Sequence, residues 1–95
     1  MAKEHSYRIT IEEIEPTEAP RRLQFEIKDR EDMLSVVEKI QQGSGLDNST
    51  ATRLGVGLRL LGPTMMENRK HPFFSEFMPH FKSFMIKLKA TVKGK

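Results

Sequence analysis

Two segments of this chain carry apolar residues at different spacings, and the contrast restricts the folds open to it. Near the N-terminus, apolar residues alternate with polar ones in two short runs, Tyr7, Ile9, Ile11 and then Leu23, Phe25, Ile27. Near the C-terminus they recur at helical spacing, at Phe74, Phe77, Met78, Phe81, Met85 and Leu88. A period of two indicates half-buried strands, and a period near 3.6 indicates an amphipathic helix. The pattern predicts an α+β fold, in which an N-terminal antiparallel β-hairpin is followed by about three α-helices packed on one face of the sheet.

The alternation also predicts where the hairpin turns. The first strand covers residues 6–12, and the phase slips by one at Glu13, which indicates a bulge or the end of the strand. Pro16 and Pro20 lie in the following loop and cannot donate to a strand ladder. The second strand covers residues 22–28, so the two strands form an antiparallel pair.

A first helix is predicted over residues 30–42. Asp29 can cap its free amides, and the acidic residues after it suit the positive end of the helix dipole. Gly43 can end the helix in the left-handed conformation.

Residues 46–70 allow two interpretations. Leu54, Leu58, Leu61 and Met65 repeat at helical spacing, but residues 54–60 also alternate as a strand would. We favour a helix, capped by Asp47 or Ser49, because the helical repeat continues past the alternation. Pro63 predicts a kink or a break, so the segment is one kinked helix or two elements.

The last segment has the strongest helical stripe. Pro72 suits a first helical position. Pro79 predicts an interruption, with one turn at 73–77 and a main helix from about Pro79 to Lys89. We expect the basic tail, residues 91–95, to be frayed.

The size and composition of the chain predict a single domain. Its 95 residues leave room for one domain over residues 1–95, with an ordered core at about 5–90. Because only 37% of the residues are hydrophobic and 31% are charged, the core should be thin and burial against a partner would help it. The absence of cysteine excludes disulfides and a thiolate zinc site. Without an apolar signal region or a run of about 20 apolar residues, we expect a cytoplasmic protein that does not contact membranes.

Charge is divided unevenly along the chain. Residues 1–50 carry seven basic and eleven acidic residues, whereas residues 51–95 carry nine and two. The basic half supplies a candidate interaction surface: Arg69, Lys70, His71, His80, Lys82 and Lys89. Such residues can bind phosphates, but no nucleic-acid motif accompanies them. A solvated face, or pairing with the acidic half, is the simpler interpretation.

No pattern typical of catalysis is present. The three histidines lack a metal-ligand spacing, the serines lack a nucleophile elbow, and the glycine pairs lack the features of a phosphate loop. We therefore assign no catalytic residue, metal or cofactor. A small enzyme would need His71 or His80 to meet a carboxylate with a perturbed pKa.

Four stretches carry a resemblance to a known family. They are residues 5–12, residues 23–26, residues 56–62, and residues 69–74 together with Pro79-His80-Phe81. The chain resembles, over about residues 5–90, a small bacterial family known only as a domain of unknown function and common in proteobacteria. The resemblance implies a compact α+β domain and favours a helix at 50–66. It implies no activity, cofactor or catalytic residue.

The hairpin itself favours self-association. A two-stranded sheet is marginal in water, and both of its strands are edges with unpaired backbone groups. We therefore expect a structural or interaction module that forms a homodimer or binds an unidentified protein. Two hairpins would join edge to edge, or the helices would pack across a twofold axis. A nucleic-acid accessory role for the basic half is the alternative.

Overall fold

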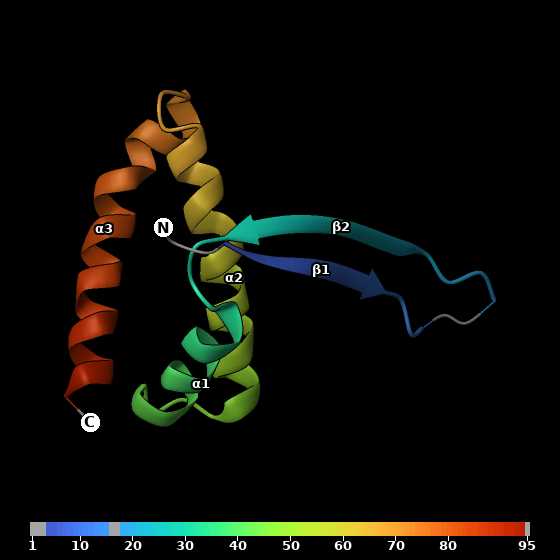
Figure 1. The fold of residues 1–95 in the computed structure, drawn as a ribbon, viewed down its shortest axis with the longest axis horizontal. Helices are drawn as coiled ribbons and strands as arrows, with labels where there is room; N and C mark the ends of the chain where they lie inside the picture. The colour runs from blue at the N-terminus through green and yellow to red at the C-terminus, as the bar shows by residue number, and fades with distance from the viewer. Residues whose placement is uncertain (1–3, 16–17, 95) are drawn as a thin grey trace. The chain divides into compact units, whose positions relative to one another are not determined.

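The computed structural model describes residues 4–15 and 18–94. It contains an antiparallel two-stranded sheet followed by three helices, as the periodicities predicted (Figure 1). The chain divides into two compact units, of which the first ends at Asp32 and the second begins at Met33. Two residues of the predictions lie outside the described residues: Pro16 of the predicted loop and Lys95 of the predicted tail.

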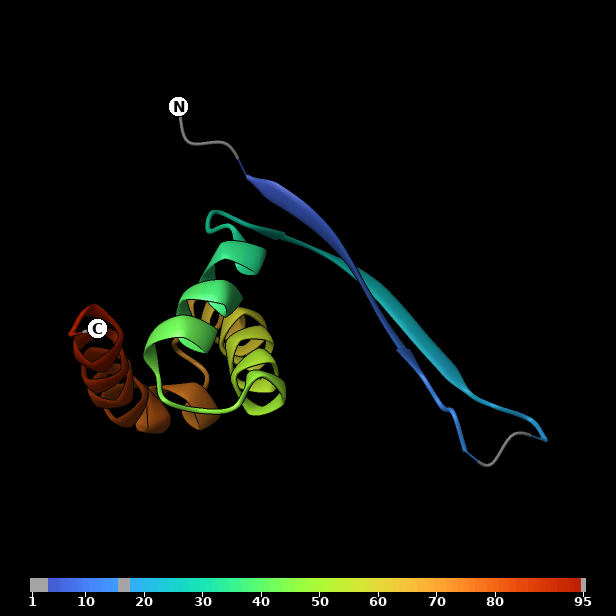
Figure 2. The ribbon, with the colours of Figure 1, turned by 90° about the horizontal axis from the view of Figure 1, so that it is seen from below.

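The first unit is the hairpin, formed by β1 (His5–Glu12) and β2 (Arg22–Asp29). Its register pairs apolar residues with each other across the strands: Tyr7 with Ile27, Ile9 with Phe25, and Ile11 with Leu23. Side chains alternate between the faces of a strand, so these six lie on one face of the ribbon. Figure 2 shows the twist of the two strands about each other.

The phase slip at Glu13 marks the end of β1. The Glu13 backbone amide donates to the Arg21 carbonyl at 3.0 Å. In return, the Glu13 carboxylate accepts from the Arg21 amide at 2.7 Å and from its guanidinium at 3.0 Å. These bonds hold the pKa of the Glu13 carboxyl below its usual range. Where the alternation fails, the Glu13 side chain therefore takes the place of its carbonyl as the acceptor for the Arg21 amide.

The apolar face of the hairpin stays open to solvent toward the loop. Ile11 is 56% exposed and its partner Leu23 is 57% exposed. Phe25 is also exposed, whereas Tyr7, Ile9 and Ile27 are half-buried. On a half-buried strand, apolar side chains of this size are ordinarily covered by other residues of the core.

The second unit begins with α1 (Met33–Gly43), three residues later than predicted. Asp29 is still paired with His5 in the sheet, and its side chain accepts from the Glu31 amide at 3.0 Å. This local bond forms a turn and delays the helix. The predicted left-handed Gly43 is also wrong, since among the described residues only Gly45 has a positive φ, of 84°.

Helix α2 (Asn48–Glu67) settles the ambiguous segment as one helix. Asp47 is its N-cap, accepting from the Thr50 amide at 3.2 Å and from the Thr50 hydroxyl at 2.6 Å. These two bonds lower the pKa of the Asp47 carboxyl. Pro63 lies inside the helix without breaking it.

The buried side of α2 confirms two members of the predicted stripe, Leu58 and Met65, and differs at the other two. Its buried residues repeat at four, three, four and three: Ala51, Gly55, Leu58, Gly62 and Met65. Leu61 is exposed and Leu54 only half-buried. A Cβ on Gly55 would lie 2.8 Å from Val37 Cγ2, so the glycine permits close approach of α1. Small residues thus share the inner side of α2 with Leu58 and Met65.

Helix α3 (Pro72–Lys93) is also continuous, and the predicted interruption at Pro79 is wrong. A proline removes one backbone hydrogen bond, but the turns on both sides of Pro79 keep helical geometry. Pro72 occupies the first turn as predicted. The helix extends four residues beyond the expected end at Lys89.

The core of the second unit lies where α1 meets the other two helices. It is centred on Ile40, Ala51 and Leu58, with partly buried residues of α3 packed against it. Gly43 contacts the backbone of Val92 so closely that a Cβ there would lie 2.9 Å from the Val92 oxygen. Figures 1 and 2 show α2 and α3 running in opposite directions, with α1 beside both.

Candidate functional site

The candidate basic residues fall into two groups. Arg69, Lys70 and His71 lie in the short connection between α2 and α3, where they line one hollow of about 500 Å³. Glu67 lines the same hollow, so the electrostatic potential in the hollow is not purely positive. His80, Lys82 and Lys89 lie along α3 and are exposed. The first three candidates are adjacent in the sequence, so their proximity does not depend on the fold.

His71 has a structural role. It is the N-cap of α3, and its Nδ1 accepts from the Phe73 amide at 3.2 Å. Its ring lies 4.7 Å from the Phe73 ring and 5.7 Å from the Phe74 ring. Nδ1 is therefore occupied by backbone and is not available as a proton acceptor for a substrate while the cap is in place.

A larger groove is lined by one residue of each basic group. It measures about 820 Å³ and lies between the end of α2 and the face of α3. Its apolar walls are Met66, Met78, Pro79, Phe81 and Met85. Arg69 and Lys82 are its charged members, and within residues 4–15 and 18–94 neither forms an ion pair. Lys89 and His80 do not line it.

Helix α3 also carries a second surface, made of exposed phenylalanines, that the sequence patterns did not predict. Phe73 is 76% exposed, Phe77 is 44% exposed and Phe84 is 45% exposed. Their spacing of four and seven places them along one line of the helix. The helical stripe predicted from the sequence includes Phe77, but the core side of α3 is formed by Phe81, Met85 and Leu88. No described residue of α3 is buried.

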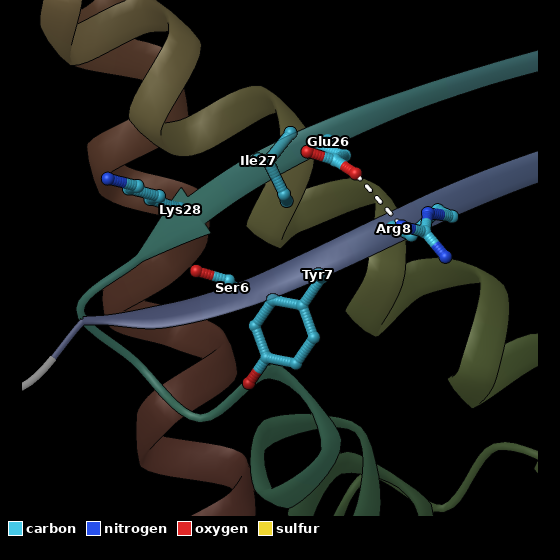
Figure 3. A pocket seen from close by; sticks show the side chains of 6 residues that line it. All are labelled: Ser6, Tyr7, Arg8, Glu26, Ile27 and Lys28. Atoms are coloured by element: carbon cyan, nitrogen blue, oxygen red, sulfur yellow. Dashed lines mark hydrogen bonds and ion pairs between the residues drawn. The ribbon is translucent and has the colours of Figure 1, made fainter.

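The hairpin carries a third hollow, of about 530 Å³, shown in Figure 3. Its lining residues come from both faces of the ribbon: Ser6, Tyr7, Arg8, Glu26, Ile27 and Lys28. Arg8 donates to Glu26 across the strands at 3.1 Å, as the dashed line marks. A hollow that follows a two-stranded ribbon does not enclose a ligand as a cleft would.

The chemistry available at these surfaces is limited. Among the described residues, no three side chains of the metal-ligating types gather into a possible metal site. Neither His71 nor His80 forms an ion pair with a described carboxylate. No helix in the described part of the chain combines the length and apolar content needed to cross a bilayer.

The comparison with known families matches residues 5–90 to a family described as a domain of unknown function with a solved structure, DUF3861. The chain belongs to this family. It is also similar to a protein of unknown function from Pectobacterium atrosepticum, known from a crystal structure. The two share 35% identity, the TM-score is 0.84, and the match covers 93% of this chain and 99% of the other. No match was found among curated proteins.

Proposed function

We propose that this protein is a small interaction module that associates with a second copy of itself. The observation that carries the proposal is the state of α3, a 22-residue helix with no buried residue among those described. An amphipathic helix in a globular protein gains most of its stability by burying its apolar face. A single copy leaves α3 with three exposed phenylalanines, which is typical of a surface that binds a partner.

The hairpin supports the same proposal. Each of its strands has one unpaired edge, and Ile11 and Leu23 remain more than half exposed. Isolated two-stranded sheets are marginally stable at best. Because the chain has no cysteine, it gains nothing from an oxidising compartment, and we place the module in the cytoplasm.

Light scattering coupled to size exclusion tests the proposal at micromolar concentration. We expect a particle of twice the 11.0 kDa chain mass. A particle of the single chain mass across the whole concentration range would overturn it.

A nucleic-acid role is the second candidate, favoured by one observation. Arg69 and Lys82 line one groove from two sides without an ion-pair partner in the described part of the chain. Phosphate contacts would then supply affinity that falls steeply as salt rises. Fluorescence anisotropy with single- and double-stranded DNA and RNA at low salt tests it, and flat titrations would exclude it.

A further inference from the structure

The exposed phenylalanines of α3 form a continuous stripe along the helix. Phe73, Phe77 and Phe84 lie within about 40° of one another around the axis, since each residue advances the helix by about 100°. His80 falls on the same stripe, between Phe77 and Phe84. The stripe therefore spans three turns and is mainly aromatic. We call it the phenylalanine stripe, defined by Phe73, Phe77, His80 and Phe84.

This stripe is distinct from the side of α3 that meets the core. Phe81, Met85 and Leu88 pack against the core cluster, and they lie farther around the helix. The ring of Phe77 approaches Phe81, with centroids 6.1 Å apart, so the stripe borders the core side directly. A partner seated on the stripe would extend the apolar packing of the unit.

We infer that the phenylalanine stripe binds the same stripe of a second copy, with the two α3 helices antiparallel about a twofold axis near His80 and Phe81. This inference rests on the proposed self-association and names its surface. A twofold interface uses the same patch on both copies. With the axis at this position, Phe77 lies opposite Phe84 of the second copy, and the contact occurs twice. Paired aromatic rings contribute beyond the area that they bury.

The charges beside the stripe select the antiparallel orientation. Glu76 and Lys87 are eleven residues apart, close to three helical turns, and so lie on the same flank of α3. The antiparallel arrangement places Glu76 within two residues of Lys87 of the second copy, again twice. In a parallel pair, the flank that carries Glu76 and Lys87 would lie against the opposite flank of the second copy, so neither of these ion pairs would form. Neither residue has an ion-pair partner in the described chain, so both are available to the second copy.

The aromatic part of the inference is tested with Phe77→Gln, measured by sedimentation equilibrium on the full chain. Interface aromatics near a twofold axis are typical hot spots. We expect the dimer dissociation constant to rise by roughly a hundredfold, with helical circular dichroism unchanged. Ile86→Gln is the matched control, because Ile86 is 62% exposed but lies on another side of α3. It should leave the constant within about twofold.

The charged part is tested by exchange. Glu76→Lys sets two positive charges against each other at both copies of the contact, and Lys87→Glu sets two negative charges against each other there. Each single variant should weaken the dimer by roughly tenfold, because two attractive contacts become repulsive. The double variant Glu76→Lys/Lys87→Glu restores opposite charges and should return the constant to within about threefold of the unaltered chain.

The outcomes separate this inference from the proposed function. A monomeric unaltered chain would overturn both. A dimer that Phe77→Gln leaves intact, or that the charge exchange does not restore, would overturn the phenylalanine stripe while self-association stands. Dissociation by Ile11→Lys, with no effect of Phe77→Gln, would assign the interface to the hairpin and would also overturn the stripe.

Discussion

Gly55 and Gly57 lie two residues apart in α2 but have different surroundings. A Cβ at Gly55 would meet Val37 Cγ2 at 2.8 Å and its Cα at 3.1 Å, whereas nothing lies within 4 Å of a Cβ at Gly57. We expect Gly55→Ala to lower the free energy of unfolding by about 1–3 kcal/mol through overpacking. Gly57→Ala should raise it by about 0.5–1 kcal/mol, because alanine is the better helix former. Urea denaturation of both variants measures the difference, and equal effects would contradict the close approach of α1.

Asp47 gives a residue-scale prediction that depends on pH. Its carboxyl has a lowered pKa because the Thr50 hydroxyl and amide donate to it. Such a group stabilises the folded state fully above the pKa that it has when unfolded, which for aspartate is ordinarily 3.8. That contribution is lost as the pH falls through the lower folded value. We expect Asp47→Ala to lower the Tm at pH 7, and the loss to shrink in strongly acidic solution.

Asp47→Asn is the control for the cap. Asparagine keeps an oxygen that can accept from the Thr50 amide but has no charge. Its Tm at pH 7 should therefore fall between those of the unaltered chain and Asp47→Ala. If the two substitutions lowered the Tm equally, the cap would not depend on an accepting oxygen.

At the scale of elements, the prolines of α3 differ by position. Pro72 occupies the first turn, where its missing N–H has no helical partner. Pro79 lies inside the helix and leaves the Ser75 carbonyl without the amide that would bond it. We expect Pro79→Ala to raise the free energy of unfolding by about 1–3 kcal/mol. Pro72→Ala should change the free energy of unfolding by only about 0.3 kcal/mol. Thermal melts of the two variants would show the contrast.

The sequence patterns predicted the elements better than the surfaces that they bury. Alternation placed both strands, but it left their register open, because a shift by two residues keeps the same side chains on the apolar face. Leu58 and Met65 on the inner side of α2 were predicted, but Gly55 and Gly62 were missed because a search for large apolar residues does not detect glycines buried by close helix approach. Phe77 belongs to the predicted helical stripe but is exposed, because helical spacing alone does not separate the border of an apolar face from its buried centre.

The effect of the two internal prolines on helix continuity was overestimated for a related reason. Pro63 and Pro79 each remove one hydrogen bond, and a local rule treats that loss as the end of a helix. Tertiary contacts offset it, since a Cβ at Gly62 would lie 3.7 Å from the Phe81 ring. The candidate basic residues could not be separated by role from the sequence. Charge alone does not distinguish His71, which caps a helix, from Arg69 and Lys82, which line the groove.

At the scale of the whole molecule, stability and association should be linked. If a dimer is the folded species and the unfolded chain is monomeric, mass action raises the Tm as protein concentration rises. For two chains of 95 residues, each tenfold increase should add roughly 3 °C. Differential scanning calorimetry over a hundredfold range of micromolar concentration measures this slope, and Ile86→Gln should keep it.

The same slope separates association through α3 from stabilisation within one chain. Phe77→Gln should lower the Tm and also flatten its dependence on concentration, because a monomer unfolds in a first-order equilibrium. Gly55→Ala should lower the Tm but keep the slope, since it disturbs packing inside each copy. A flat slope in the unaltered chain would mean that α3 is stable without a second copy, despite the exposure of Phe73, Phe77 and Phe84.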